Sequence, residues 1–256
     1  MFKYLLCFLL SIFILSSCYV SFPKETLEQD VVKFIKEETN TDTTAYKCGS
    51  TLYLDVCLED LVTDDKQKII EIYDVLQKIV SNVVRVPLSS DASIKFVVVS
   101  AFDPNYQTLL RLFENVDDIK KYSYHFISRE DYSERQLMEF EGPNRTKEIV
   151  DNKYDLTEEE FVARLIVSQL NSIARTNPFL SVLIQVLELK FSHIEGDKFY
   201  FTASRKINNK EIEKTVQTIL EKEFVKNIQK YKLFSIKSAI LLDEDKNIIL
   251  NIPINV

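Results

Sequence analysis

Glycine is so scarce in this chain that several common folds are excluded before other residues are considered. The sequence contains three glycines, Gly49, Gly142 and Gly196, which lie far apart. Phosphate-binding loops such as G-x-G-x-x-G and G-x-x-x-x-G-K need clustered glycines, because the backbone must approach the ligand closely. The nucleophile turn G-x-S-x-G is also missing. Dinucleotide-binding folds, P-loop nucleotide hydrolases and typical α/β-hydrolases are therefore disfavoured, and we expect no cofactor.

The first residues have the layout of a secretion signal. Lys3 supplies one positive charge, and an almost purely apolar run follows from Leu5 to Leu15. A basic residue followed by about 7–15 apolar residues is typical of a secretory signal. The run is too short for a membrane-spanning helix, which needs about 20 apolar residues. We therefore predict that residues 1–17 are a signal peptide.

The apolar run ends in Leu15-Ser16-Ser17-Cys18, which resembles the lipobox of bacterial lipoproteins. In that family the cysteine sulfur receives a diacylglycerol, the signal is cut before the cysteine, and the new amine is acylated. The resemblance implies lipidation of Cys18 and a location in the bacterial cell envelope. Tyr19 is not the aspartate that often marks inner-membrane retention, so the resemblance favours the outer membrane. An ordinary secretory signal with a chance cysteine is the alternative.

Lipid at Cys18 would fix the rest of the chain at a membrane surface. Each buried methylene contributes about 0.8 kcal/mol, so several acyl chains hold stably where one holds only marginally. The formal net charge of −7 repels anionic headgroups, which leaves the anchoring to the lipid. Nucleic acid is a poor partner for an acidic chain, because its affinity rests on cationic contacts to phosphates. We expect two partners, the membrane and an envelope protein.

The rest of the chain is long enough for one large domain or two smaller ones. A charged stretch from 129 to 155, with Gly142-Pro143-Asn144 at its centre, is typical of a long surface loop and of a module boundary. No repeat of 20–50 residues is visible. We predict a tether at 18–25, an N-terminal α/β module at 26–150 and a C-terminal α+β module at 151–256, or one domain containing both modules.

Hydrophobic periodicity predicts the elements of the N-terminal module. Thr26 and Gln29 have the spacing of a capping box, which begins a helix. A polar linker at 39–44 follows that helix. The predicted elements are a helix at 26–38, a half-buried strand at 52–58, a helix at 64–85 whose inward residues include Ile69, Ile72 and Tyr73, a central strand at 94–101, a short helix at 107–114 and a strand at 122–126.

The C-terminal module is predicted to contain a helix and then a hairpin–helix–hairpin. A capping box at Thr157–Glu160 begins the first helix, and Asn177-Pro178 ends it. Residues 179–186 fit a helix or a strand equally well. Hairpins at 187–203 and 234–254 flank a helix at 209–231, and Pro253 indicates an edge strand. These segregated hairpins favour an α+β fold, with mixed or antiparallel sheets and helices mainly on one face.

Cys48 and Cys57 are the cysteines that remain beyond Cys18 in the mature chain. A disulfide is allowed in an extracytoplasmic compartment. In one straight strand the two residues would be about 30 Å apart, so a disulfide needs a turn near Gly49-Ser50. The alternative is two small buried residues.

No constellation in the sequence selects a catalytic or metal site. His125 and His193 lie in predicted strands and have no neighbouring nucleophile or ligand motif. The stretch 243–247 resembles the start of a calcium loop, but Ile248 replaces the required glycine, so we expect a hairpin turn. The acids Glu158 to Glu160 are explained by capping and by the helix macrodipole.

Aromatic residues gather near the middle of the chain, at Tyr122, Tyr124, Phe126 and Tyr132. They could line a binding face. Core packing is the expected role, because aromatic side chains dominate protein cores.

These observations favour a membrane-anchored lipoprotein with a binding or assembly role and without enzymatic activity. An envelope hydrolase that uses paired carboxylates is the first alternative. It requires two facing acids in a deep pocket, at least one of them with a raised pKa. A purely structural or surface-exposed lipoprotein is the second alternative, and it would show neither a pocket nor an exposed apolar patch.

Overall fold

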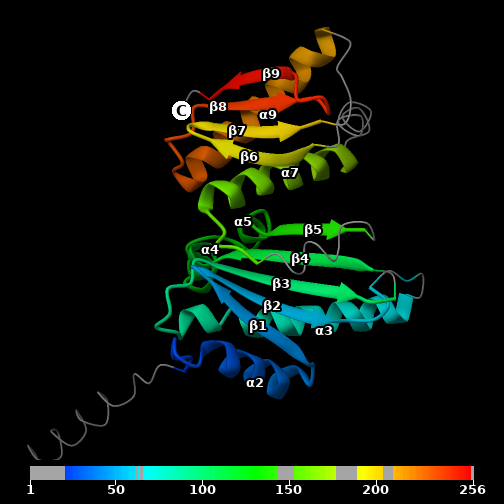
Figure 1. The fold of residues 1–256 in the computed structure, drawn as a ribbon, viewed down its shortest axis with the longest axis vertical. Coiled ribbons are helices and arrows are strands. Elements are labelled where there is room, and N and C mark those ends of the chain that lie inside the picture. The colour runs from blue at the N-terminus through cyan, green and yellow to red at the C-terminus, as the bar shows by residue number, and fades with distance from the viewer. Residues whose placement is uncertain are drawn as a thin grey trace, which may run out of the picture. The chain divides into compact units, whose positions relative to one another are not determined.

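The computed structural model describes residues 21–61, 63, 66–105, 107–142, 153–176, 189–203 and 210–254. They form two sheets with accompanying helices, which confirms the expected α+β class (Figure 1). The chain divides into two compact units. Unit 1 comprises Met1–Arg111, Asn115–Tyr124 and Glu141–Lys153, and unit 2 comprises Leu112–Glu114, His125–Phe140 and Tyr154–Val256.

The larger sheet has five strands in the order β1-β2-β3-β4-β5. β1 and β2 form an antiparallel hairpin, whereas β2 and β3 are parallel. The helix α3 connects the two parallel strands, as a parallel pair requires. The elements are α2 (Leu27–Thr39), β1 (Thr43–Cys48), β2 (Thr51–Cys57), α3 (Lys66–Val83), a 3-10 turn (Val86–Leu88), β3 (Phe96–Asp103), β4 (Thr108–Asn115), α4 (Val116–Ser123) and β5 (Leu137–Glu141).

Aliphatic side chains fill the core of unit 1. α2 packs on β1 and on α3, and α3 packs on β3. The central strand predicted at 94–101 is confirmed as β3, because nearly all of its residues are buried. β2 was predicted to be half-buried, but Tyr53 on its second face is also buried. The Lys153 ammonium lies 5.2 Å from the centre of the Tyr53 ring, which accounts for part of this cover.

Three predictions in the N-terminal module are wrong. Residues 107–114 form the strand β4, and residues 122–126 end a helix and enter a turn. The Asn115 side chain accepts hydrogen bonds from the backbone N–H groups of Asp117 and Asp118, at 2.9 and 3.4 Å. This N-cap begins α4 and overrides the strand preference of the tyrosines that follow. The polar linker at 39–44 contains the start of β1.

The smaller sheet has four strands in the order β6-β7-β8-β9. β6 and β7 are antiparallel, β7 and β8 are parallel, and β8 and β9 are antiparallel. The hairpin–helix–hairpin order is therefore confirmed, and β9, which contains Pro253, is an edge strand as predicted. Its elements, with the helices of unit 2, are α5 (Arg129–Ser133), α7 (Glu158–Thr176), β6 (Lys190–Glu195), β7 (Lys198–Thr202), α9 (Lys210–Tyr231), β8 (Ser238–Leu242) and β9 (Ile248–Pro253).

The stretch predicted as one long loop, 129–155, contains the short helix α5 and the strand β5. Its centre, residues 143–152, lies outside the described residues, as does the ambiguous stretch 179–186. The sequence pattern did not predict β5, because this edge strand is polar: Glu139 and Glu141 alternate with Met138 and Phe140. The loop prediction is therefore wrong for residues 129–133 and 137–141.

The helix starts at α2 and α7 differ in how their first N–H groups are satisfied. The Thr157 hydroxyl accepts a hydrogen bond from the Glu160 N–H at 3.2 Å, which is one half of the predicted capping box, while the Glu160 carboxylate accepts from Tyr154 and Arg164. Thr26 is the N-cap of α2, but its side chain makes no capping bond. Its hydroxyl instead donates to the Asp30 carboxylate at 2.6 Å, so the capping box predicted with Gln29 is wrong.

The two sheets repeat one order of elements. In one, a helix (α2), a hairpin, a helix (α3) and two further strands follow each other along the chain. In the other, α7, the β6–β7 hairpin, α9 and the β8–β9 pair do the same. In both, the helix between the strand pairs joins two parallel strands. Among the described elements, an αββαββ order thus occurs twice, with a period longer than the 20–50 residues of common repeats.

Candidate functional site

Phe22, which lies four residues after Cys18, packs against the rest of unit 1. The Phe22 N–H donates to the Ser89 carbonyl at 3.3 Å, and the Phe22 carbonyl accepts from the Ser90 hydroxyl at 2.7 Å. Its ring packs edge-on against Phe34 of α2, with centroids 5.3 Å apart. Cys18 itself lies outside the described residues, so its lipidation stays a prediction.

Backbone hydrogen bonds place the start of α4 at the same end of the strands as Phe22. The Lys95 N–H donates to the Ser50 carbonyl at 2.7 Å, and the Lys95 carbonyl accepts from the Val116 N–H at 2.8 Å. Ser50 precedes β2, Lys95 precedes β3, and Val116 follows β4. Residues 89 and 90, which hold Phe22, come a few residues before Lys95 and the start of β3. We call this end of unit 1, marked by Phe22, Ser50, Lys95 and Val116, the anchor end.

The aromatic cluster predicted to pack in the core is largely exposed. The exposed fractions are 37% for Tyr122, 68% for Tyr124 and 78% for Phe126. α4 ends at Ser123, and His125 adopts a left-handed backbone with φ 59°, so these rings stand on a turn. Tyr132 differs, because its hydroxyl donates to the Glu114 carboxylate at 2.8 Å. The expected core packing is therefore wrong for Tyr122, Tyr124 and Phe126.

The most extensive polar network described in unit 2 surrounds Arg164 of α7. Its Nη1 lies 3.1 Å from a Glu139 carboxylate oxygen, and its Nη2 lies 2.7 Å from Glu160. The Tyr154 hydroxyl accepts from Nη2 at 3.0 Å and donates to Glu160 at 2.7 Å. The guanidinium carbon lies 5.7 Å from the centre of the Phe191 ring. The network joins β5, the segment before α7, and α7 itself.

The electrostatics of this network favour a structural role. Burial alone would lower the pKa of Arg164, but Glu139, Tyr154 and Glu160 outweigh burial and raise that pKa above its ordinary value. Arg164 therefore stays a cation, and Glu139 and Glu160 share it as their counter-ion. A paired-carboxylate catalyst needs two acids that face its substrate, whereas these two carboxylates both face the Arg164 guanidinium. Sequence reasoning missed the network, although the four-residue spacing of Glu160 and Arg164 was visible.

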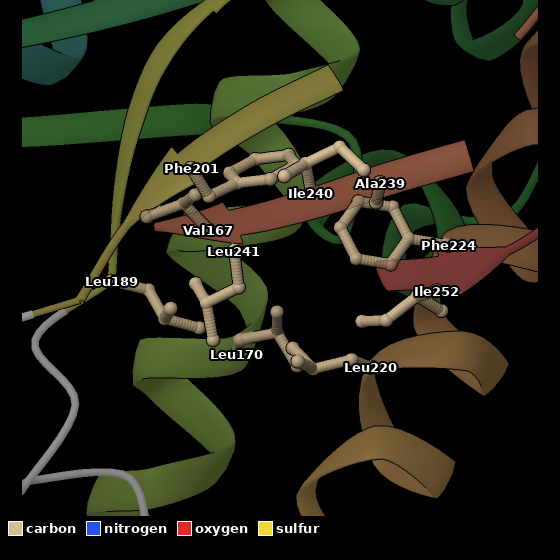
Figure 2. Close-up of a pocket in the computed structure, with 10 residues that line it drawn as sticks. All are labelled: Val167, Leu170, Leu189, Phe201, Leu220, Phe224, Ala239, Ile240, Leu241 and Ile252. Carbon is tan, nitrogen blue, oxygen red and sulfur yellow. The ribbon is translucent and has the colours of Figure 1, made fainter. Parts of the chain in front are cut away.

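A small apolar hollow lies between α7, α9 and the four-stranded sheet (Figure 2). Val167 and Leu170 of α7 face Leu220 and Phe224 of α9 across it, with Phe201 of β7 beside them. The hollow has room for about one water molecule. Its lining side chains are all apolar. It is therefore a packing gap in the core of unit 2, and it lacks the converging polar groups of a substrate pocket.

Cys48 and Cys57 are both free thiols. A turn does occur at Gly49-Ser50, but the register pairs Cys48 with Thr51, and Cys57 ends the strand six residues further along. This separation is about 20 Å, which excludes a disulfide in this structure. The alternative of two buried residues is also wrong, because Cys57 is exposed and Cys48 is half-buried.

The remaining candidates have ordinary structural roles. His193 lies in β6 as predicted, and its ring stacks on Tyr200 with centroids 4.5 Å apart. His125 was predicted in a strand but lies exposed in the turn after α4. The Asp243 carboxylate accepts from the Asn247 N–H at 2.7 Å, which closes the predicted hairpin turn. Within the described ranges, no three His, Cys, Asp or Glu side chains are grouped to hold a metal.

Comparisons with known proteins add no relative. The chain matches no family model, no curated protein and no solved structure. In the part of the chain that the structure describes, no helix has both the length and the apolar content needed to cross a bilayer.

Proposed function

We propose that this chain is a lipid-anchored protein of the bacterial envelope, most consistent with the outer membrane, and that its body binds an envelope protein without catalysing a reaction. The observation that carries the proposal is the Leu15-Ser16-Ser17-Cys18 sequence at the end of an apolar run. Its position supports the proposal, because the packed body begins at Phe22, just after the cysteine.

An exposed apolar face on α3 supports the binding role. Ile69, Ile70 and Tyr73 are 48%, 55% and 64% exposed. Tyr73 follows the two isoleucines by four and three residues, so the three side chains share one side of the helix. The sequence pattern had placed Ile69 and Tyr73 inward, and this is wrong. Adjacent large apolar side chains on a surface favour a protein contact.

The hydrolase alternative has little support from the described residues. It required two acids that face each other in a deep pocket. Glu139 and Glu160 do approach a common point, but Arg164 occupies it and pairs with both. The hollow of unit 2 is apolar and holds about one water molecule. We therefore favour binding over hydrolysis as the role of the body.

The anchor is tested by metabolic labelling with an alkyne fatty acid in a bacterial host. The wild-type chain should be labelled and should fractionate with membranes, whereas Cys18→Ser should do neither. Cys57→Ser is the matched control, since Cys57 is an exposed free thiol, and it should be labelled like the wild type. Label on Cys18→Ser, or none on the wild type, would contradict the anchor.

The binding face is tested by cross-linking in cells followed by quantitative comparison of the captured envelope proteins. Ile70→Asp places a charge on the α3 face and should remove a protein that the wild type captures. Ile248→Asp is the control, because Ile248 is an isoleucine of similar exposure, 66%, on β9 of the other unit. An identical set of captured proteins for both variants would exclude the α3 face as the binding site.

A further inference from the structure

We propose that the anchor end of unit 1 rests on the lipid surface itself, with Tyr122 and Tyr124 placed among the lipid headgroups. This inference rests on the proposed lipidation of Cys18. It adds an orientation of unit 1 and a second, direct contact between protein and bilayer.

The length of the tether carries the first step. Cys18 and Phe22 are four residues apart, and an extended chain covers at most about 3.6 Å per residue. The lipidated sulfur therefore lies within about 14 Å of Phe22 along the chain. Phe22 is fixed on unit 1, because it forms hydrogen bonds with Ser89 and Ser90 and its ring packs against Phe34. The anchor end is consequently held close to the headgroup layer.

The position of α4 carries the second step. α4 begins at the anchor end, where the Val116 N–H donates to the Lys95 carbonyl. The helix has eight residues and is therefore about 12 Å long. Val116, Asp118 and Ile119 bury one side of it. Tyr122 and Tyr124 follow in its last turn and C-cap, and Tyr124 is 68% exposed.

The chemistry of these side chains fits a lipid surface. Tyrosine has an apolar ring and a polar hydroxyl, and it is enriched at the headgroup level of membranes. Lys120 and Lys121 precede the tyrosines, and their long stems can lie along apolar surface while the ammonium groups stay in water. At this depth the apolar ring of a tyrosine is shielded from water, while its polar end stays at the level of the headgroups.

Charge decides which lipid surface is suitable. Each lysine ammonium near the tether and on α4 has a carboxylate beside it. The N–O distances are 3.7 Å for Lys24 and Glu25, 3.9 Å for Lys120 and Asp117, and 3.2 Å for Lys121 and Asp118. Asp91, which accepts from the Lys24 N–H, and the exposed Lys95 add one charge of each sign. The named charges of the anchor end are thus balanced, in a chain of formal net charge −7. The contact should therefore be made with zwitterionic lipid and should not depend on salt, because it does not rest on attraction to anionic headgroups.

Tyr73 provides a matched comparison within unit 1. It is 64% exposed, nearly the same as Tyr124, but it lies in the first half of α3. α3 ends at Val83, near the anchor end, and Tyr73 is ten residues earlier, about 15 Å along the helix. Figure 1 shows the first half of α3 at the opposite end of the strands. The proposal places Tyr124 in the headgroup layer and Tyr73 in water.

The experiment uses tryptophan fluorescence, since the chain contains no tryptophan of its own. Lipidated full-length Tyr124→Trp and Tyr73→Trp are reconstituted into phosphatidylcholine vesicles with and without acyl-chain bromination. At position 124 the indole emission should be blue-shifted, and brominated lipid should cause a loss of emission, as for a ring at the headgroup–acyl boundary. At position 73 neither change should occur. Raising the salt concentration should leave both results unchanged.

Acylation and flotation separate the two proposals. A chain that is not acylated overturns the proposed anchor and this inference together. An acylated chain that floats with the vesicles, but shows equal or no quenching at positions 124 and 73, overturns the orientation and leaves the anchor intact. Tyr122→Trp is the second variant, and its emission should be quenched like that of Tyr124→Trp. It keeps the test decisive if the substitution at position 124 disturbs folding.

Discussion

The αββαββ segments of the two units share an order of elements but differ in what fills and fastens them. In unit 1 the two long helices bury aliphatic residues, including Val31 and Ile79. In unit 2 the equivalent helices meet through aromatic rings, with Phe161 of α7 and Tyr231 of α9 5.9 Å apart. The Asn227 amide of α9 also donates to Gln169 of α7 at 2.9 Å.

The strands of the two units differ in how deeply they are buried. β2 is buried along most of its length, whereas β7 alternates between buried and half-exposed residues. In unit 1 an ion pair lies on the second face of β2, where the Lys153 ammonium is 2.6 Å from the Asp55 carboxylate. Unit 2 uses the larger network around Arg164. The order of elements therefore fixes the pairing of strands, while the side chains decide how each unit is stabilised.

The largest effect is expected from removing an aromatic ring in the core of unit 2. Phe224 is 2% exposed, and its ring lies 5.1 Å from that of Phe201. Phe224→Ala should lower the free energy of unfolding by about 4 kcal/mol, through lost burial and a new cavity. Hydrogen exchange should rise in α9 and β7. Phe96→Ala in β3 should instead raise exchange in unit 1, and equal exchange in both units for both variants would contradict the division.

The next largest effect concerns the Arg164 network. Arg164→Met leaves Glu139 and Glu160 without their shared cation, and it should cost about 3 kcal/mol in urea unfolding. Adding Glu139→Gln should recover part of the loss, because one uncompensated charge is then removed. Arg129→Met, at an exposed arginine, should change stability by less than about 0.5 kcal/mol. Equal results for Arg164→Met and Arg129→Met would exclude the network as a fastening of unit 2.

The ion pair of unit 1 should contribute less. Lys153→Met removes one charged contact to Asp55 and the cation above the Tyr53 ring, at a cost of about 2 kcal/mol. Lys33→Met is the control, because Lys33 and Glu37 are exposed partners 3.9 Å apart. A cost for Lys153→Met that exceeds the cost for Arg164→Met would reverse the proposed difference between the units.

The smallest effect compares the two helix starts. Thr157→Ala removes a hydroxyl that accepts the Glu160 N–H, and it should cost about 1 kcal/mol. Thr26→Ala removes an exposed bond to Asp30 that does not cap the helix, and its cost should stay below about 0.5 kcal/mol. Urea unfolding of the two variants measures the difference, and equal costs would mean that the hydroxyl of Thr157 does not act as a cap.

Strong periodicity explains which elements could be predicted. α2, α3, α7 and α9 carry apolar residues at three- and four-residue spacing, and β3 is an unbroken apolar run. β4 was mistaken for a helix because its short apolar pattern fits both periods. The stretch 122–126 was mistaken for a strand because the Asn115 cap, which decides its conformation, lies seven residues earlier.

The candidate sites were harder to predict, because they depend on distant residues. Glu160 and Arg164 are neighbours on one helix, but Glu139 reaches Arg164 from a strand that the sequence pattern had assigned to a loop. Tyr124 is exposed because α4 ends just before it, and the amino-acid composition around Tyr124 does not indicate this. The position of Phe22 against Ser89 and Ser90 is likewise set by tertiary contacts.

The anchor at Cys18 is the claim on which the remaining proposals depend. It is tested most directly by mass spectrometry of the N-terminal peptide of the protein purified from bacterial membranes. The expected product is a chain that starts at Cys18, with diacylglycerol on the sulfur and an acyl group on the amine. A free thiol at Cys18, or a mature chain that starts at another residue, would contradict it.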